Sequence, residues 1–174
     1  MRNINLTIAN KESQMTDNEL YHFITVQDSF NRFPAFVKLY MEGIISRKQY
    51  IDNIIDAYTM SDNLYKYRDL VRTAFGWYKS LIDESGSKII DGDIISLPQY
   101  IKVYRGMTKA ESRNKQYGVS WTLDKNVAEF FAYNYMRNYD TAKYKKTVIS
   151  KTINKDDILY YSNNRNEKEI IILI

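Results

Sequence analysis

The sequence predicts an α+β fold, in which a helical region over residues 1–90 precedes a compact mixed β core over residues 91–174. Apolar residues recur at helical spacing in the first half, whereas short segments with strand character fill the second half. The pattern changes after "DESGSKIIDGD". At 174 residues we expect one compact domain overall, with one domain plus a sizeable helical extension as the alternative, because two domains of full size do not fit.

Two capping boxes mark helix starts in the first half. The segments "TDNE" and "SRKQ" place Thr16 and Ser46 as N-caps, with Glu19 and Gln49 three residues on. A third, long helix is expected to begin near Ser61. Its predicted core-facing stripe is Leu64, Tyr67, Val71, Ala74, Tyr78 and Leu81.

Five segments of the second half are predicted to form strands. They read "YIKVYRG", "YGVSWT", "KKTVISKTI", "DDILYY" and "EKEIIILI". Between the second and the third lies "DKNVAEFFAYNYMRN", which is expected to form a helix capped by Asp124. The face that this helix turns to the core is predicted to hold Ala128, Phe131, Ala132 and Tyr135.

Residue types that are absent or scarce narrow the chemistry. The chain has no cysteine, which excludes disulfide scaffolds, thiolate zinc sites and cysteine nucleophiles. Its six scattered glycines form neither a dinucleotide-binding turn nor a P-loop, so side chains must hold any nucleotide phosphate. The single histidine, His22, falls on a predicted helix far from the other candidate groups, which favours a structural role over a Ser-His-Asp site.

The net charge of +4 mildly favours acidic partners or phosphate-bearing ligands, without reaching the charge of a dedicated nucleic-acid binder. No apolar stretch is long enough to span a bilayer, and the start "MRNINLTIANKESQ" lacks the apolar core of a signal peptide. We therefore expect a monomer with no membrane partner, in the cytoplasm of the producing or infected cell. A secreted effector is the alternative.

Two segments of the β core carry candidate ligand-binding groups. In "VYRGM", Arg105 is expected to end a strand and to offer a bidentate fork to phosphate or carboxylate, while Gly106 would let a ligand approach the backbone. In "GVSWTLD", strand alternation puts Ser120 and Thr122 on one face and Trp121 on the other, so that two hydroxyls can orient a carboxylate or a ribose. A solvated arginine and ordinary cross-strand packing are the alternative interpretations.

Two glutamates open the isoleucine run in "EKEIIIL". Residues two apart in a strand point the same way, so Glu167 and Glu169 are expected on one face with Cα atoms roughly 6.6 Å apart, and Lys168 on the other. Paired carboxylates suit the departure of a leaving group from a sugar carbon, since one offsets oxocarbenium charge and the other orients the nucleophile. The alternative is a solvated strand edge whose charges resist aggregation.

Together, these segments resemble the Arg-Ser-Glu, or cholera-toxin-like, class of mono-ADP-ribosyltransferases, in the form of a small bacterial or phage-type member. The resemblance covers Tyr100–Ile174 and is most specific in "GVSWTLDKNVAEFFA" and "DDILYYSNNRNEKEIII". It implies a β core of the ADP-ribosyltransferase type that uses NAD as its substrate. It also implies transfer of ADP-ribose to an acceptor, with arginine of a target protein as the expected one.

The resemblance also implies roles residue by residue. Arg105 matches the arginine that contacts an NAD phosphate, Ser120 matches the serine that positions NAD and the catalytic glutamate, and Glu169 matches that glutamate. Glu167 matches the first residue of the Glu-x-Glu pattern, which goes with arginine as the acceptor. The segment "YYSNNRN" would then be the turn that recognises the target.

Three further residues complete the expected NAD-binding set: Tyr104, Gly106 and Thr122. Tyr104 or Tyr133 would stack on nicotinamide, with core packing as the alternative. Many members of the class read Ser-Thr-Ser where this chain has Trp121 in the middle, so Trp121 is expected to pack. The helical region is expected to pack beside the NAD cleft.

Three other functions stay open at this point. A glycohydrolase would pass ADP-ribose to water, although Glu167 would then serve only to orient that water. A nucleic acid is a second acceptor class, because the chain is basic and some members of the wider superfamily modify bases. A non-catalytic binding module on the same fold is the third. Cleavage of NAD needs no metal, because nicotinamide is already a good leaving group, and no metal site is expected.

Overall fold

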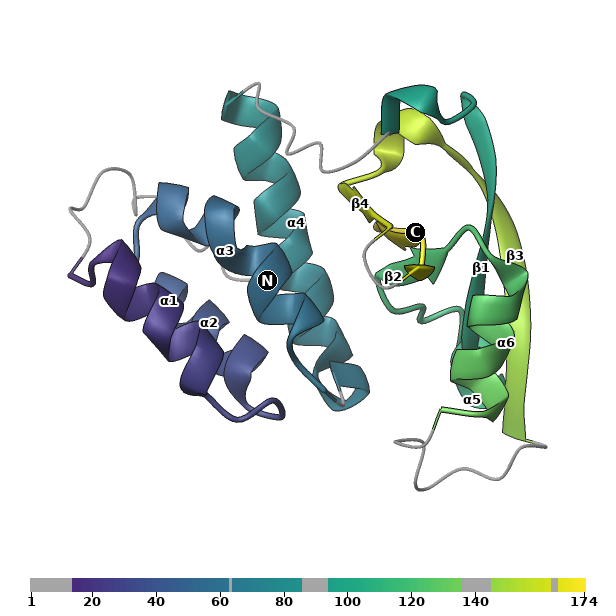
Figure 1. Ribbon diagram of the computed structural model, residues 1–174, viewed down its shortest axis with the longest axis horizontal. Helices are drawn as coiled ribbons and strands as arrows, with labels where there is room; N and C mark the ends of the chain where they lie inside the picture. The colour runs from purple at the N-terminus through teal and green to yellow at the C-terminus, as the bar shows by residue number, and fades with distance from the viewer. Residues whose placement is uncertain (1–13, 63, 86–93, 136–144, 164–165) are drawn as a thin grey trace. The chain divides into compact units, whose positions relative to one another are not determined.

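The computed structural model describes residues 14–62, 64–85, 94–135, 145–163 and 166–174. The chain divides into two compact units, Met1–Ser87 and Lys88–Ile174, and each is described by itself (Figure 1). The first unit is helical, and the second contains the β-sheet. The predicted α+β class, with helices before strands, is therefore confirmed, and the division falls close to the predicted boundary after residue 90.

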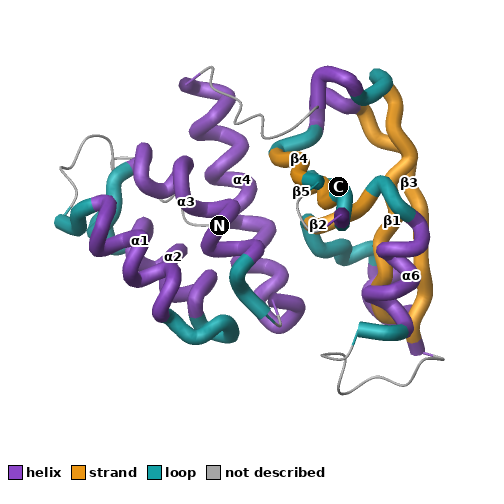
Figure 2. The backbone as a smooth tube through the Cα atoms, viewed as in Figure 1, coloured by secondary structure: helices purple, strands orange, loops and turns teal. Residues whose placement is uncertain are grey.

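Two of the described helices of the first unit, which Figure 2 draws in purple, begin at a capping box. Both predicted capping boxes are present: the Thr16 hydroxyl accepts from the Glu19 N–H and the Glu19 carboxylate from the Thr16 N–H, with Ser46 and Gln49 doing the same. His22 lies exposed on the first helix, so it takes no part in the core. The α-helices are α1 (Asp17–Val26), α2 (Arg32–Met41), α3 (Arg47–Thr59) and α4 (Arg68–Ser85).

The long helix starts later than predicted. Ser61 instead follows the end of α3. Its hydroxyl donates a hydrogen bond to the Ala57 carbonyl and accepts one from the Phe33 N–H. A 3-10 helix, η1 (Leu64–Tyr67), then precedes α4 at Arg68. The first two residues of the predicted stripe are accordingly half-buried, whereas the remaining four are buried: Val71, Ala74, Tyr78 and Leu81.

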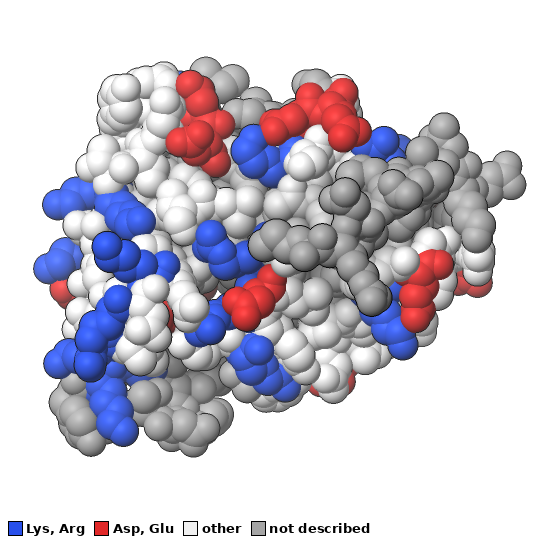
Figure 3. Space-filling view, turned by 180° about the vertical axis from the view of Figure 1, so that it is seen from behind, with Lys and Arg blue, Asp and Glu red and all other residues white. Residues whose placement is uncertain are grey.

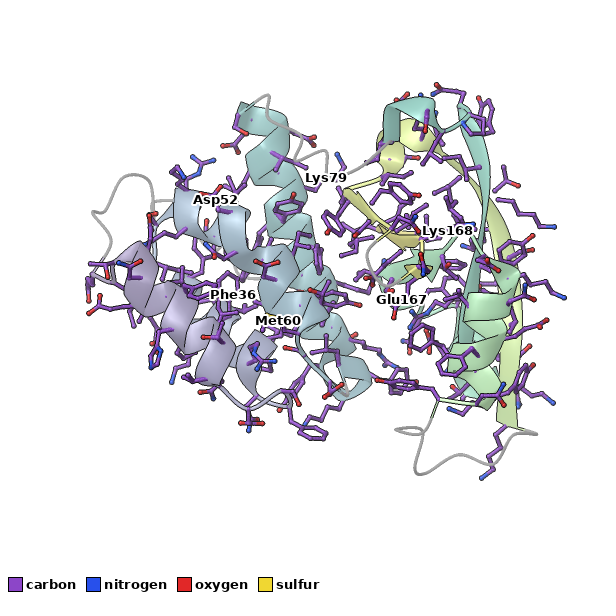
Figure 4. The ribbon with its side chains drawn as sticks, in the orientation of Figure 1. Phe36, Asp52, Met60, Lys79, Glu167 and Lys168 are labelled. Carbon is purple, nitrogen blue, oxygen red and sulfur yellow. The ribbon has the colours of Figure 1, made fainter. Side chains whose placement is uncertain are left out.

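Stacked aromatic rings and one buried cation hold the helical unit together. Phe36, labelled in Figure 4, lies among these helices and stacks on Tyr50 with ring centroids 5.5 Å apart. Arg32 is 7% exposed and donates hydrogen bonds to main-chain carbonyls at the C-terminal ends of α1 and α3. Such carbonyls lack helical partners, so a guanidinium there satisfies several of them at once.

The second unit contains a five-stranded sheet with the order β3-β1-β2-β5-β4, and its pairs are antiparallel. All five predicted segments supply a strand, but three of the strands are only three residues long. The first two residues of the predicted strand "DDILYY" instead belong to the 3-10 helix η4 (Lys155–Asp157). The strands are β1 (Tyr100–Thr108), β2 (Ser120–Thr122), β3 (Lys146–Asn154), β4 (Tyr160–Ser162) and β5 (Glu169–Ile171).

Two helices accompany the sheet: α5 (Lys109–Asn114) and α6 (Lys125–Tyr133). As predicted, the Asp124 side chain caps α6 by accepting from the Asn126 N–H. The helix ends at Tyr133, and the last residues of the predicted helix lie outside the described residues. Figure 1 shows α6 lying along β1 and β3, with which it makes most of its contacts.

Gly106 lets α6 approach β1 closely. A Cβ atom at this position would lie 2.2 Å from the Ala128 carbonyl oxygen and 2.8 Å from the Ala132 nitrogen. Both alanines are buried, as predicted for the core face of α6. The expectation that Gly106 leaves room for a ligand is therefore wrong on this side, because the helix occupies that space.

Candidate active site

Ser120 and Glu169 meet across the neighbouring strands β2 and β5. The Ser120 hydroxyl donates a hydrogen bond of 2.7 Å to Glu169 Oε1. In the register of these strands Ser120 lies opposite Ile171, and Glu169 lies opposite Thr122, so the contact is diagonal. Both side chains are half-buried. The serine thus orients the carboxylate and leaves it partly accessible.

Tyr104 and Glu169 are in register across the sheet, each paired with Thr122 of the strand between them. Tyr104 pairs with Thr122 on β2, and Thr122 pairs with Glu169 on β5. Cross-strand partners share a face, so these three side chains lie on one face of the sheet. Trp121 is 2% exposed and packs edge-on against Tyr117 in the core, as expected from strand alternation.

The Thr122 hydroxyl fastens two main-chain segments. It donates to the Glu167 carbonyl at 2.6 Å and accepts from the Asp124 N–H at 3.0 Å. The Leu123 N–H also donates to the Lys168 carbonyl at 3.1 Å. These contacts fix the turn before β5 against the end of β2, and an NAD contact from Thr122 stays a prediction.

Glu167 lies in that turn and not in a strand. Lys168 has a φ of 45°, which is left-handed, and β5 begins only at Glu169. Strand alternation therefore does not apply to Glu167. The prediction that Glu167 and Glu169 share one face of a strand is wrong, because Glu167 is not in the strand. The side chain of Glu167 is half-buried, and Figure 4 labels it with Lys168 at this turn.

Arg105 lies within β1, three residues before its end, and not at the end as predicted. Its side chain is 19% exposed and forms an ion pair of 2.9 Å with Glu111. Its Nη1 donates to the Ser120 carbonyl at 2.6 Å. A Cβ atom on Gly118 would lie 2.3 Å from its Nη2, so the guanidinium packs directly against that glycine. The interpretation of Arg105 as a solvated arginine is wrong.

Glu111 contacts the candidate site, although no sequence pattern placed it there. It is 3% exposed, and its Oε1 accepts from Arg105 Nε and, at 3.1 Å, from the Gly118 N–H. The segment "TKAE" fits a capping box, which would have assigned Glu111 to the N-terminus of a helix. Only half of that box forms, since the Thr108 hydroxyl accepts from the Glu111 N–H while the carboxylate pairs with Arg105.

Lys146 adds a second cation near Glu111. It lies opposite Thr108 in the register of β1 and β3 and is 8% exposed. Burial lowers the pKa of Lys146, and the negative charge of Glu111 partly offsets this effect.

Positive charge is concentrated in the second unit. Of the 25 Lys and Arg residues 15 fall in Lys88–Ile174, against 10 of the 21 Asp and Glu residues, which gives this unit a formal net charge of +5. Figure 3, which views the molecule from behind, shows Lys and Arg side chains gathered at the left, where the second unit lies. Its exposed cationic residues include Lys102, Lys109, Arg113, Lys115, Lys125, Lys145 and Lys168.

Within the described ranges, no group of three or more His, Asp or Glu side chains is arranged to hold a metal ion. No helix in those ranges has the length and apolar character needed to cross a membrane. Comparisons of the chain with protein-family models, with curated proteins and with solved structures gave no match.

Proposed function

We propose that this protein is a mono-ADP-ribosyltransferase that cleaves NAD and transfers ADP-ribose to an arginine of a target protein. The observation that carries the proposal is the 2.7 Å hydrogen bond between the Ser120 hydroxyl and Glu169. The resemblance assigned these two residues to positioning and catalysis from sequence alone, and they are 49 residues apart in the chain.

Glu169 would carry the donor half of the reaction. Its carboxylate accepts a hydrogen bond from the 2′-hydroxyl of the nicotinamide ribose. It also offsets positive charge at the anomeric carbon as the bond to nicotinamide breaks. The electron pair of that bond leaves with nicotinamide. Ser120 keeps the carboxylate oriented, so little reorganisation is needed in the transition state.

Tyr104 and Arg105 are the residues of β1 that would bind NAD. Tyr104 shares the sheet face of Glu169, which supports a stacking role against nicotinamide. Arg105 uses its Nε and one N–H of Nη1 inside the protein. A phosphate contact from this residue would use its other N–H groups. Tyr133 is 36% exposed on α6 and is the second candidate for stacking.

Glu167 would serve the acceptor. The turn that carries it is hydrogen-bonded to the end of β2 and directly precedes β5, so the two carboxylates lie two residues apart in one segment. The acceptor guanidinium attacks the anomeric carbon through nitrogen, and Glu167 accepts the proton released when the new bond has lowered the pKa of that nitrogen.

The experiment is to incubate the purified protein with NAD labelled in its adenylate phosphate and a cell lysate. Arginine as the acceptor predicts labelled protein bands that survive acid, are removed by neutral hydroxylamine and resist nuclease. The basic second unit favours a nucleic acid as the second candidate acceptor, and nuclease-sensitive label would select it. NAD loss with no labelled macromolecule would select the glycohydrolase.

A further inference from the structure

A buried polar cluster lies next to the Ser120–Glu169 pair. We define the Arg105 brace as Arg105, Glu111 and Gly118. One carboxylate oxygen of Glu111 accepts from Arg105 Nε at 2.9 Å and from the Gly118 N–H at 3.1 Å. The three residues come from β1, α5 and the segment before β2, so the brace joins three elements of the second unit.

The brace reaches the candidate site through the main chain of Ser120. Arg105 Nη1 donates to the Ser120 carbonyl at 2.6 Å, and the hydroxyl of the same serine donates to Glu169 at 2.7 Å. The described pairing of β1 with β2 consists of Tyr104 and Thr122, so the guanidinium bridges the two strands beyond that pair. The guanidinium is therefore one of the contacts that place Ser120 relative to Glu169.

The stability of the fold does not by itself account for this cluster. Burying a carboxylate and a guanidinium costs desolvation free energy, and well-packed apolar residues of similar volume are often as stabilising. Glu111 is nevertheless 3% exposed, and Gly118 leaves no room for a Cβ beside the guanidinium. A charge-assisted hydrogen bond adds directional specificity to its energy, which suits the placement of a neighbouring group.

We propose that Glu111 is a positioning residue: it fixes the guanidinium of Arg105, and through the Ser120 carbonyl it fixes the Ser120 hydroxyl against Glu169. The inference rests on the proposed function for its effect on catalysis. Its structural content, the coupling of Glu111 to the Glu169 carboxylate, is independent of any activity.

Kinetics test the catalytic effect. Glu111→Gln keeps the volume and an acceptor oxygen but removes the charge opposite Arg105. We expect kcat for nicotinamide release to fall about tenfold or more, because the substitution misplaces Ser120 against Glu169. KM for NAD should rise by a smaller factor, because Arg105 keeps its charge for a phosphate contact and loses only its fixed position. In a Ser120→Ala background the same substitution should have little further effect, since both act through one contact. Glu42→Gln, at an exposed ion pair of the first unit, is the matched control.

A second measurement needs no activity. The side-chain carboxyl resonance of Glu169 in 13C NMR is assigned by its loss in Glu169→Gln. We expect it to shift in Ser120→Ala and, in the same direction, in Glu111→Gln and in Gly118→Ala, whose added Cβ displaces the Arg105 guanidinium. It should not shift in Glu42→Gln. Circular dichroism identifies the variants that fold, and Gly118→Ala replaces Glu111→Gln if the latter does not.

The outcomes separate the two claims. If the wild-type protein does not cleave NAD, the proposed function is wrong. The NMR shifts then still test whether Glu111 is coupled to the Glu169 carboxylate. A Glu169 resonance that moves in Ser120→Ala but stays in place in Glu111→Gln and Gly118→Ala overturns the positioning role. The positioning role is also overturned if Glu111→Gln lowers kcat equally in the wild-type and the Ser120→Ala backgrounds, or if it raises KM and leaves kcat unchanged.

Discussion

The Ser120 hydroxyl and Glu169 Oε1 lie 2.7 Å apart on the neighbouring strands β2 and β5. A hydroxyl that donates to a carboxylate at this distance holds it in one orientation. In the proposed function, this contact gives the serine a supporting role and the glutamate the chemical one.

Removing the serine hydroxyl should slow catalysis. We expect Ser120→Ala to lower kcat for nicotinamide release by a factor on the order of 10 to 100, with KM for NAD nearly unchanged, because the carboxylate is present but has lost the hydrogen bond from Ser120. Steady-state kinetics measure both values. Ser80→Ala, an exposed serine on α4, is the control. An unchanged kcat in Ser120→Ala would contradict the supporting role.

Removing Glu167 should separate transfer from hydrolysis. In Glu167→Gln, protein labelling from NAD should fall steeply while slow NAD hydrolysis persists, because Ser120 and Glu169 still form the donor half. Gel autoradiography and nicotinamide release, measured on the same samples, distinguish the two. A parallel loss of both activities would count against a dedicated acceptor role. The control is Lys168→Gln, in the same turn. The Lys168 Nζ lies 4.0 Å from Asp124 Oδ2.

Tyr104 should contribute to NAD binding through its ring. Tyr104→Ala is expected to raise KM for NAD about two- to twelvefold, corresponding to ~0.5–1.5 kcal/mol of ring contact, whereas Tyr104→Phe should retain the wild-type value. Tyr100, which is 70% exposed on the same face of β1, gives the matched control. Equal effects of the alanine substitutions at both positions would show that the ring at Tyr104 has no special role.

Two glycines should respond in opposite directions to alanine. At Gly106 the new Cβ would lie 2.2 Å from the Ala128 carbonyl oxygen, so Gly106→Ala should lower the free energy of unfolding by about 1–3 kcal/mol. At Gly76, within α4, nothing lies within 4 Å of the added Cβ, and Gly76→Ala should raise it by about 0.5–1 kcal/mol. Urea denaturation measures both values. A Gly106→Ala protein as stable as wild type would show that α6 does not pack at this distance.

Local sequence signals predicted the elements of the fold better than the environments of single residues. The capping boxes at Thr16 and Ser46 were found because both partners lie within four residues of each other. The strand segments were found from their β-branched and aromatic content. The start of α4 was misplaced because Ser61 is held by Phe33 of α2, which is a tertiary contact that no local pattern shows.

The sequence predicted which residues belong to the candidate site but not how the chain places them. Ser120 and Glu169 were selected together, and they do meet. Glu167 was assigned to a strand because nothing in "EKEIIIL" signals the left-handed Lys168. Glu111 was missed because its partner Arg105 lies on β1, and only the fold brings the α5 carboxylate against that strand.

The most direct test of the account is nicotinamide release from NAD by the purified wild-type protein and by Glu169→Gln. The proposed function predicts that the wild type releases nicotinamide. It also predicts that Glu169→Gln does so more slowly, by a factor on the order of 10² or more, while it keeps the wild-type fold by circular dichroism. This is the loss expected when an electrostatic contact to the transition state is removed. A Glu169→Gln protein as active as wild type, or a folded wild type that leaves NAD intact both alone and with a cell lysate, would contradict the account.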